Sequence, residues 1–66
     1  MIEVRIVENG ARAEAATPED AVYAAITIGR EAKEQRGIQG FDPTVVFEVA
    51  GKIVRTSTLR SLARVY

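Results

Sequence analysis

Two short turn sequences, Asn9-Gly10 and Gly51-Lys52, each lie between segments in which apolar and polar residues alternate. Alternation with a period of two is typical of a strand with one buried face, and a two-residue loop containing glycine joins such strands into a hairpin. Residues 17–36, between the two hairpins, have the pattern of a helix. The sequence therefore predicts an α+β fold: β-hairpin, long helix, β-hairpin and a short C-terminal segment.

In the first hairpin, Ile2, Val4 and Ile6 share one face, and Val7 is an apolar exception on the other. A two-residue loop at Asn9-Gly10 predicts three cross-strand pairs: Ile6 with Ala13, Arg5 with Glu14, and Val4 with Ala15. The second strand lies within residues 11–16, which are rich in alanine, so we expect a short edge strand. A helix that starts at Ala11 and is interrupted by Pro18 is the alternative.

The second hairpin has Val45, Phe47 and Val49 on its buried face. A turn at Gly51-Lys52 predicts three pairs: Val49 with Val54, Glu48 with Arg55, and Phe47 with Thr56. The other face should be solvated, and apolar residues on it would form a patch on the outer side of the sheet. The candidate self-association residues are therefore Val7, Val46, Ala50 and Ile53.

The helix has clear start and stop signals. Thr17 can cap it, Pro18 suits its first position, and acidic residues follow at the positive end of its dipole. We expect it to run to about Arg36 and to end at Gly37 in the left-handed conformation, with Ile38 packed back on the last turn. Its small buried residues predict a close approach, most simply within the molecule: Ala21, Ala25, Gly29 and Ala32.

Residues 59–66 fit one or two helical turns capped by Ser57 or Thr58, because Leu59, Leu62, Ala63 and Tyr66 then form one stripe. A strand is the alternative, although each of its faces would mix arginine with apolar residues. The predicted architecture is one domain of residues 1–66, with a mostly antiparallel sheet of three or four strands and the long helix packed on one face. The strand order stays open.

Composition excludes several classes of protein. The chain has no Cys and no His, which removes disulfides and the usual ligands of zinc, haem and iron–sulfur clusters, so we expect no metal and no cofactor. With only 66 residues to form a core, oligomerisation is the stabiliser left open. The N-terminal residues lack the features of a signal peptide and no run reaches ~20 apolar residues, so we expect a cytoplasmic protein.

The chain has few of the side chains that catalysis commonly uses. Without His, general acid–base chemistry lacks its commonest group, and the hydroxyls of Ser57, Thr58 and Ser61 have no recognisable base beside them. We expect no enzyme; a deep pocket lined by two or more carboxylates would be needed to support one. Residues 37–40 match the G-x-x-G pattern of nucleotide-binding KH loops, but a helix cap followed by a loop glycine explains them better.

Charge is distributed unevenly along this formally neutral chain. Residues 52–66 hold four cations and no acid, whereas residues 1–51 hold five cations and nine acids. The candidate partner-binding residues are these four cations: Lys52, Arg55, Arg60 and Arg64. Because Arg55 should pair with Glu48 and Lys52 should be solvated at a turn, the candidate binding site reduces to Arg60 and Arg64 on the terminal segment. The alternative is that these terminal arginines pair with acids of residues 1–51.

The first functional hypothesis is a small non-enzymatic interaction module of accessory or regulatory type that binds another protein and associates with itself as a homodimer. The alternative is a nucleic-acid-binding protein that uses the basic C-terminal segment. In size, layout and lack of catalytic groups the chain is similar to the small accessory proteins of phages and mobile elements; the likeness is one of class and not of motif.

Overall fold

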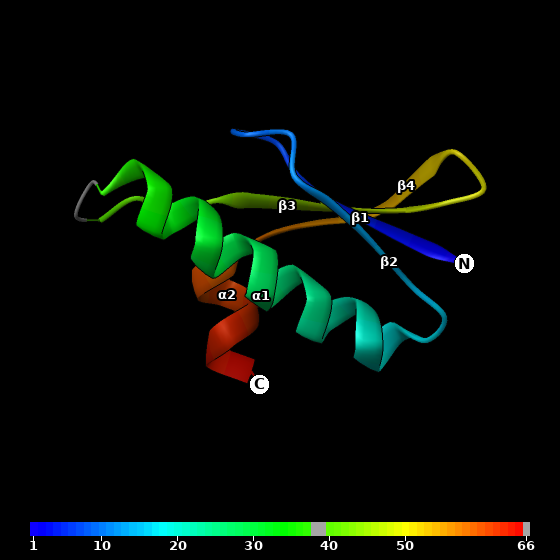
Figure 1. Cartoon of the computed structure of the whole chain (residues 1–66). Coiled ribbons are helices and arrows are strands. Elements are labelled where there is room, and N and C mark those ends of the chain that lie inside the picture. Colours follow the sequence, from blue (N-terminus) through cyan, green and yellow to red (C-terminus); the bar gives the residue numbers. More distant parts are fainter. Residues whose placement is uncertain (38–39, 66) are drawn as a thin grey trace.

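The computed structural model describes residues 1–37 and 40–65 and has the predicted α+β architecture. In chain order its elements are β1 (Ile2–Ile6), β2 (Arg12–Ala15), α1 (Pro18–Arg36), β3 (Thr44–Val49), β4 (Lys52–Thr58) and α2 (Leu59–Val65). The strands form one antiparallel sheet in the order β2-β1-β3-β4. Figure 1 shows α1 crossing one face of this sheet, with α2 beside it.

The strand order places the most apolar strands in the middle. β1 and β3 are rich in Ile, Val and Phe, and each is paired on both sides. The two edges are the alanine-containing β2 and the Thr- and Ser-rich β4, which is exposed over most of its length. This arrangement gives the central positions to the residue types that pack best on a pleated, half-buried surface.

The predicted register of the first hairpin is wrong by two residues. Val4 lies opposite Ala13, and the Ile6 N–H donates to the Ala11 carbonyl at 2.8 Å, so the loop has four residues. Gly10 supplies the positive φ, at 73°, and the Asn9 side chain accepts the Ala11 N–H at 2.9 Å. Because a shift of two residues keeps every side chain on its face, the predicted inner face is still correct.

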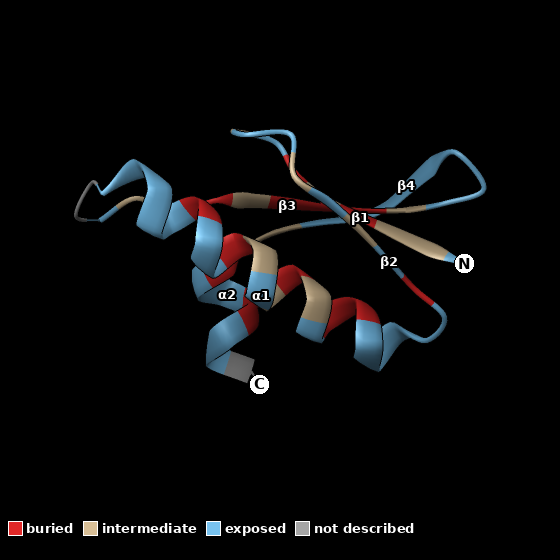
Figure 2. Ribbon diagram, viewed as in Figure 1, coloured by how far each residue is buried: buried red, intermediate tan, exposed pale blue. Residues whose placement is uncertain are grey.

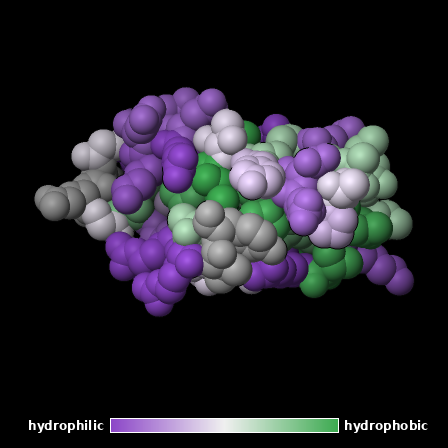
Figure 3. Space-filling view, turned by 90° about the horizontal axis from the view of Figure 1, so that it is seen from below, coloured by the Kyte–Doolittle hydropathy of each residue, from purple (hydrophilic) through white to green (hydrophobic). Residues whose placement is uncertain are grey.

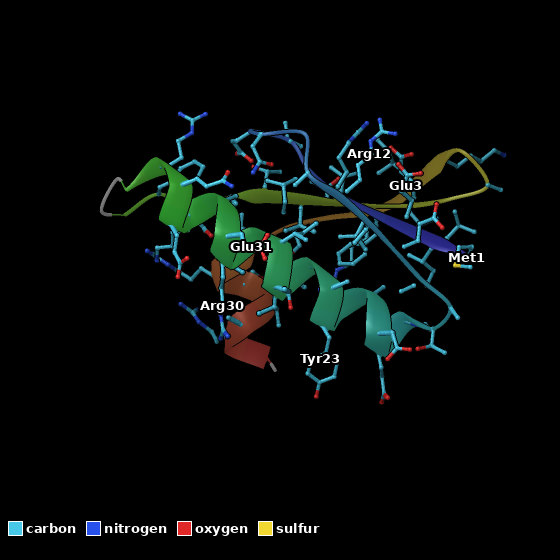
Figure 4. All side chains as sticks on the ribbon, viewed as in Figure 1. Met1, Glu3, Arg12, Tyr23, Arg30 and Glu31 are labelled. Carbon is cyan, nitrogen blue, oxygen red and sulfur yellow. The ribbon has the colours of Figure 1, made fainter. Side chains whose placement is uncertain are left out.

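The shift changes the ion pairs on the outer face of the sheet, the face away from α1. Arg5 lies opposite Arg12 and not Glu14, and it pairs with Glu48 on the neighbouring β3, 3.2 Å away. Arg12 reaches diagonally to Glu3, at 3.6 Å, and Figure 4 shows these two side chains beside each other above the sheet. The like charges that the register places opposite one another are therefore compensated by diagonal and cross-strand partners.

The predicted turn of the second hairpin is also displaced. The turn residues are Ala50 and Gly51, with φ of 53° and 78°, the positive values that a type I′ turn requires. A β-bulge then separates two registers, so that Phe47 lies opposite Arg55, Glu48 opposite Ile53 and Val49 opposite Lys52. The predicted pair of Glu48 with Arg55 is wrong, because Glu48 is bound to Arg5 instead.

Helix α1 follows its sequence signals. The Asp20 N–H donates to the Thr17 hydroxyl at 3.2 Å, and the left-handed Gly37 donates its N–H to the Lys33 carbonyl at 3.1 Å. The predicted packing of Ile38 and the place of Tyr66 lie outside the described residues. Within the described residues, no helix combines the length and the apolar character needed to cross a bilayer.

The core lies between the inner face of the sheet and the two helices. Figure 2 shows the buried residues gathered where α1, α2, β1 and β3 face one another. The members of this cluster are almost all small or β-branched: Val4, Ile6, Ala15, Ala21, Val22, Ala25, Ala32, Val45, Phe47 and Leu62. Val46 is also buried, with 4% exposed, on the outer face between Arg5 and Thr56, so the prediction that it is solvated is wrong.

The C-terminal segment is the predicted helix, α2. Thr58 caps it, since its hydroxyl accepts the Ser61 N–H at 3.2 Å, and the Asp42 carboxylate accepts the Arg60 N–H at 2.8 Å. A Cβ atom at Gly29 of α1 would lie 3.0 Å from Cδ1 of Leu59. At Gly29 the predicted close approach is therefore made within the molecule, between α1 and α2, while Ala21, Ala25 and Ala32 belong to the core cluster.

Glu8 joins the first hairpin loop to the start of β3. Its carboxylate accepts the Thr44 N–H at 2.8 Å and the Thr44 hydroxyl at 2.9 Å. Burial alone raises the pKa of Glu8, but these hydrogen bonds, one from its own backbone N–H and the charge of Arg36 outweigh it and lower the pKa. A lowered pKa means that the ionised form is favoured in the folded state.

The stabilisation from Glu8 is therefore present above the ordinary glutamate pKa and is lost as the pH falls through the lowered one. We expect Glu8→Gln to reduce the free energy of unfolding by about 1–2 kcal/mol at pH 7, because hydrogen bonds to a charged group are lost. In urea unfolding measured at pH 7 and at a pH below the ordinary glutamate pKa, the difference in unfolding free energy between wild type and variant should be smaller at the lower pH. A difference that is the same in acid would contradict this role.

Candidate functional site

A groove of about 470 Å³ lies between α1, α2 and the segment that enters β3. Four of its lining residues are cations, and we call it the basic groove: Arg30 and Lys33 from α1, and Arg60 and Arg64 from α2. The rest of its lining is mostly apolar: Phe41, Leu59 and Ala63, with Asp42. Figure 3 shows separate areas of hydrophilic surface towards the end of the molecule where α1 ends, with hydrophobic surface between these areas.

Helical spacing explains why the cations converge. Arg30 and Lys33 are three residues apart and Arg60 and Arg64 are four apart, so each pair lies on one side of its helix. Arg30 projects from α1 towards the side on which α2 lies (Figure 4). The close contact at Gly29, the residue before Arg30, holds the two helices together, and it therefore brings the two pairs to the same groove.

The groove cations have no acidic partner among the residues that the structure describes. The ion pairs there are Arg5 with Glu48 and Arg12 with Glu3, both on the outer face of the sheet. The interpretation that the terminal arginines pair with acids of residues 1–51 is therefore not borne out over the described part of the chain. Four clustered like charges repel one another, and an anion placed between them relieves that repulsion.

The aromatic wall of the groove is already engaged on one side. The guanidinium of Arg36 lies 5.2 Å from the centre of the Phe41 ring, within the range of a cation–π interaction. Asp42, the one acid in the lining, binds the Arg60 backbone N–H at 2.8 Å. This carboxylate therefore serves the first turn of α2 rather than the arginine side chains.

The four cations predicted to bind a partner do not lie together. Arg60 and Arg64 line the basic groove, whereas Lys52 is the first residue of β4 and Arg55 follows three residues later on the same strand. The sequence prediction missed Arg30 and Lys33 because nothing local indicates that α2 packs against their part of α1. Gly29 was a signal, since it allows two helices to approach closely.

The candidate self-association residues are also dispersed. Ala50 and Ile53 lie at or next to the β3–β4 turn, Val46 is buried, and Val7 lies at the other end of β3, where its N–H donates to the Thr44 carbonyl at 3.0 Å. The Arg5–Glu48 pair lies between these ends on the outer face. The structure thus forms no continuous patch from these four residues.

One hollow is lined by several carboxylates, which is the feature that the sequence analysis required of an enzyme. Glu3, Glu14 and Glu48 line a space of about 140 Å³ on the outer face near the β3–β4 turn. Two of the three are bound to arginines, at 3.6 Å for Glu3 and 3.2 Å for Glu48. The described residues contain no group of His, Cys, Asp and Glu arranged to hold a metal ion.

Comparisons with family models, curated proteins and solved structures find no match to this chain. The basic groove is therefore interpreted from its own geometry. It offers four cations on two helices around an apolar floor, an arrangement that is complementary in charge and polarity to an anionic group carried next to an apolar one.

Proposed function

We propose that this protein is a small non-enzymatic interaction module that binds an acidic segment of a partner protein in the basic groove. The observation that carries the proposal is the convergence of Arg30, Lys33, Arg60 and Arg64 on one groove, with no acidic partner among the described residues. Acidic side chains of the segment pair with these cations, and an apolar side chain packs on Leu59 and Ala63.

The surroundings of the groove favour a protein segment over nucleic acid. Without the four groove cations, the chain has five cations and nine acids, so the rest of the surface repels a long polyanion. Nucleic-acid binders combine basic stripes with aromatic faces for base stacking, whereas Arg36 already occupies one face of the Phe41 ring here. A short segment avoids the acidic surroundings and also uses the apolar floor.

The test is fluorescence anisotropy with a labelled acidic peptide that carries one central leucine. We expect Arg60→Glu combined with Arg64→Glu to weaken binding by at least ~30-fold, because two attractions become repulsions. Lys52→Glu, the matched reversal outside the groove, should change the affinity by less than about twofold. The same peptide with serine in place of leucine should bind more weakly to the wild-type protein.

Labelled single-stranded and duplex oligonucleotides at low salt form the second arm of the experiment. Binding of an oligonucleotide that is tighter than that of the peptide, and is lost in the double variant, would replace the protein segment by nucleic acid as the partner. A peptide affinity that Lys52→Glu reduces as strongly as the groove variant would refute the site itself.

A further inference from the structure

A second groove, of about 270 Å³, opens at the other end of α1 from the basic groove. We call it the apolar groove; its main lining residues are Ile2, Val22, Phe47, Val49, Val54 and Arg55. Val22 and Phe47 belong to the core cluster, so the core reaches the surface here. Val54 at its rim is 61% exposed, and Ile53 and Met1 are exposed at the same end.

The β-bulge explains why this groove escaped sequence prediction. Continued from the turn, a regular ladder would set Val54 directly opposite Phe47, whereas the bulge makes Val54 an extra residue without a register partner. Val54 and Arg55 both line the groove, beside Phe47 and Val49. Apolar surface was predicted on the outer face of the sheet, whereas the apolar groove lies beside the N-terminal end of α1.

The two rims of the apolar groove carry opposite charges. On the β4 side lies Arg55, which has no acidic partner among the described residues. On the α1 side, Glu19 and Asp20 follow the groove residue Pro18, and both are exposed. A two-fold axis that runs along the groove sets the α1 rim of one copy against the β4 rim of the other, so that Arg55 meets this acidic turn twice.

We infer that the occupant of the apolar groove is a second copy of this chain, in a two-fold dimer held by Val54 and by Arg55 against the first turn of α1. This inference does not depend on the acidic ligand proposed for the basic groove. A biological interface takes at least about 500 Å² from each copy, and a stable one about 600–1,000 Å², out of an accessible surface of 4375 Å² here.

The dimer contact is made by side chains and not by adding strands to the sheet. The exposed edge β4 carries Lys52, Arg55 and the bulge, which are the features that protect an edge from pairing with another strand. A β4 to β4 pairing would also bring four cations together with no acid on either strand. The acidic first turn of α1 removes that repulsion only when the grooves face each other.

The test is sedimentation velocity from low micromolar to several hundred micromolar protein. Wild type should pass from the 7.2 kDa monomer to a species of twice that mass. Val54→Asp should weaken the dimer at least ~30-fold, since it places two carboxylates in the groove. Val7→Asp is the matched control, because Val7 is similarly exposed, at 54%, and lies away from the groove; it should change little. Circular dichroism checks that both variants fold.

A charge exchange tests the two-fold arrangement directly. Arg55→Glu and Glu19→Arg should each weaken the dimer about tenfold or more, whereas an equimolar mixture of the two variants should recover it, because both contacts then join opposite charges. A wild-type chain that stays monomeric, a Val7→Asp effect as large as that of Val54→Asp, or a mixture without recovery would each overturn the proposal. Peptide binding to the basic groove is measured separately, so failure of one proposal leaves the other standing.

Discussion

Phe47→Ala is expected to lower the free energy of unfolding by about 3–5 kcal/mol, because it removes a large ring from the centre of a small core. Phe47 is 5% exposed, lies opposite Val4 on β1 and belongs to the buried cluster under α1. A chain of this length has about 3–10 kcal/mol of stability in total at typical values per residue. Urea unfolding followed by circular dichroism should therefore show a midpoint at a much lower urea concentration than that of wild type.

The matched control is Phe47→Leu, which keeps most of the apolar volume and should cost much less. The measurements belong at low micromolar concentration, where dimerisation adds least to stability. If the alanine variant unfolded at the same urea concentration as wild type, with an unchanged slope, Phe47 would not be a core residue.

Leu62→Ala is expected to cost about 2–5 kcal/mol, because the Leu62 side chain of α2 is fully buried and its replacement leaves a cavity. The same substitution should weaken binding of the acidic peptide, although no charge changes. The reason is that Leu62 and Leu59 hold α2, and with it Arg60 and Arg64, against α1.

Leu62→Met is the control for this second variant, since it conserves volume and should keep both stability and peptide affinity near wild type. Measurements at protein concentrations and temperatures where the alanine variant is still folded separate the two effects. A folded Leu62→Ala variant with wild-type affinity would contradict the dependence of the basic groove on the docking of α2.

Local signals predicted each element, because the residues that decide them are close in sequence. Thr17, Pro18 and Gly37 bound α1 through hydrogen bonds within a few residues, and Thr58 does the same for the start of α2. The alternation of apolar residues placed Val4, Ile6, Val45 and Phe47 correctly in the core, whereas Val49, predicted to be buried with them, is exposed. These features need no knowledge of the rest of the chain.

Both registers depended on contacts that the sequence does not contain locally. In the first hairpin, Asn9-Gly10 indicated a two-residue loop, but the bonds from Glu8 to Thr44 of β3 accompany a loop of four residues. In the second, Gly51 is the second turn residue rather than the first, and Ala50 adopts positive φ. A shift of one residue there removed the expected Glu48–Arg55 pair and, with the bulge, changed which side chains are exposed.

Only two of the four cations of the basic groove could be predicted from the sequence. Arg60 and Arg64 follow from the helical pattern of the last residues, whereas Arg30 and Lys33 join them through the packing of two helices that are distant in sequence. The apolar groove was not predicted, because it has two causes that are not local in sequence. One is the bulge in β4, and the other is that α1 begins here and leaves this part of the sheet uncovered. Long-range packing decides both surfaces.

Gly29 fixes the width of the basic groove. Its missing side chain lets Leu59 approach to a distance at which a Cβ would lie 3.0 Å from Cδ1, and this contact sets how far α2 stands from α1. The spacing between the two pairs of cations therefore depends on the absence of a Cβ atom at residue 29, a position that carries no charge itself. A chain with a larger residue at 29 would keep every arginine and lysine and yet match a wider ligand.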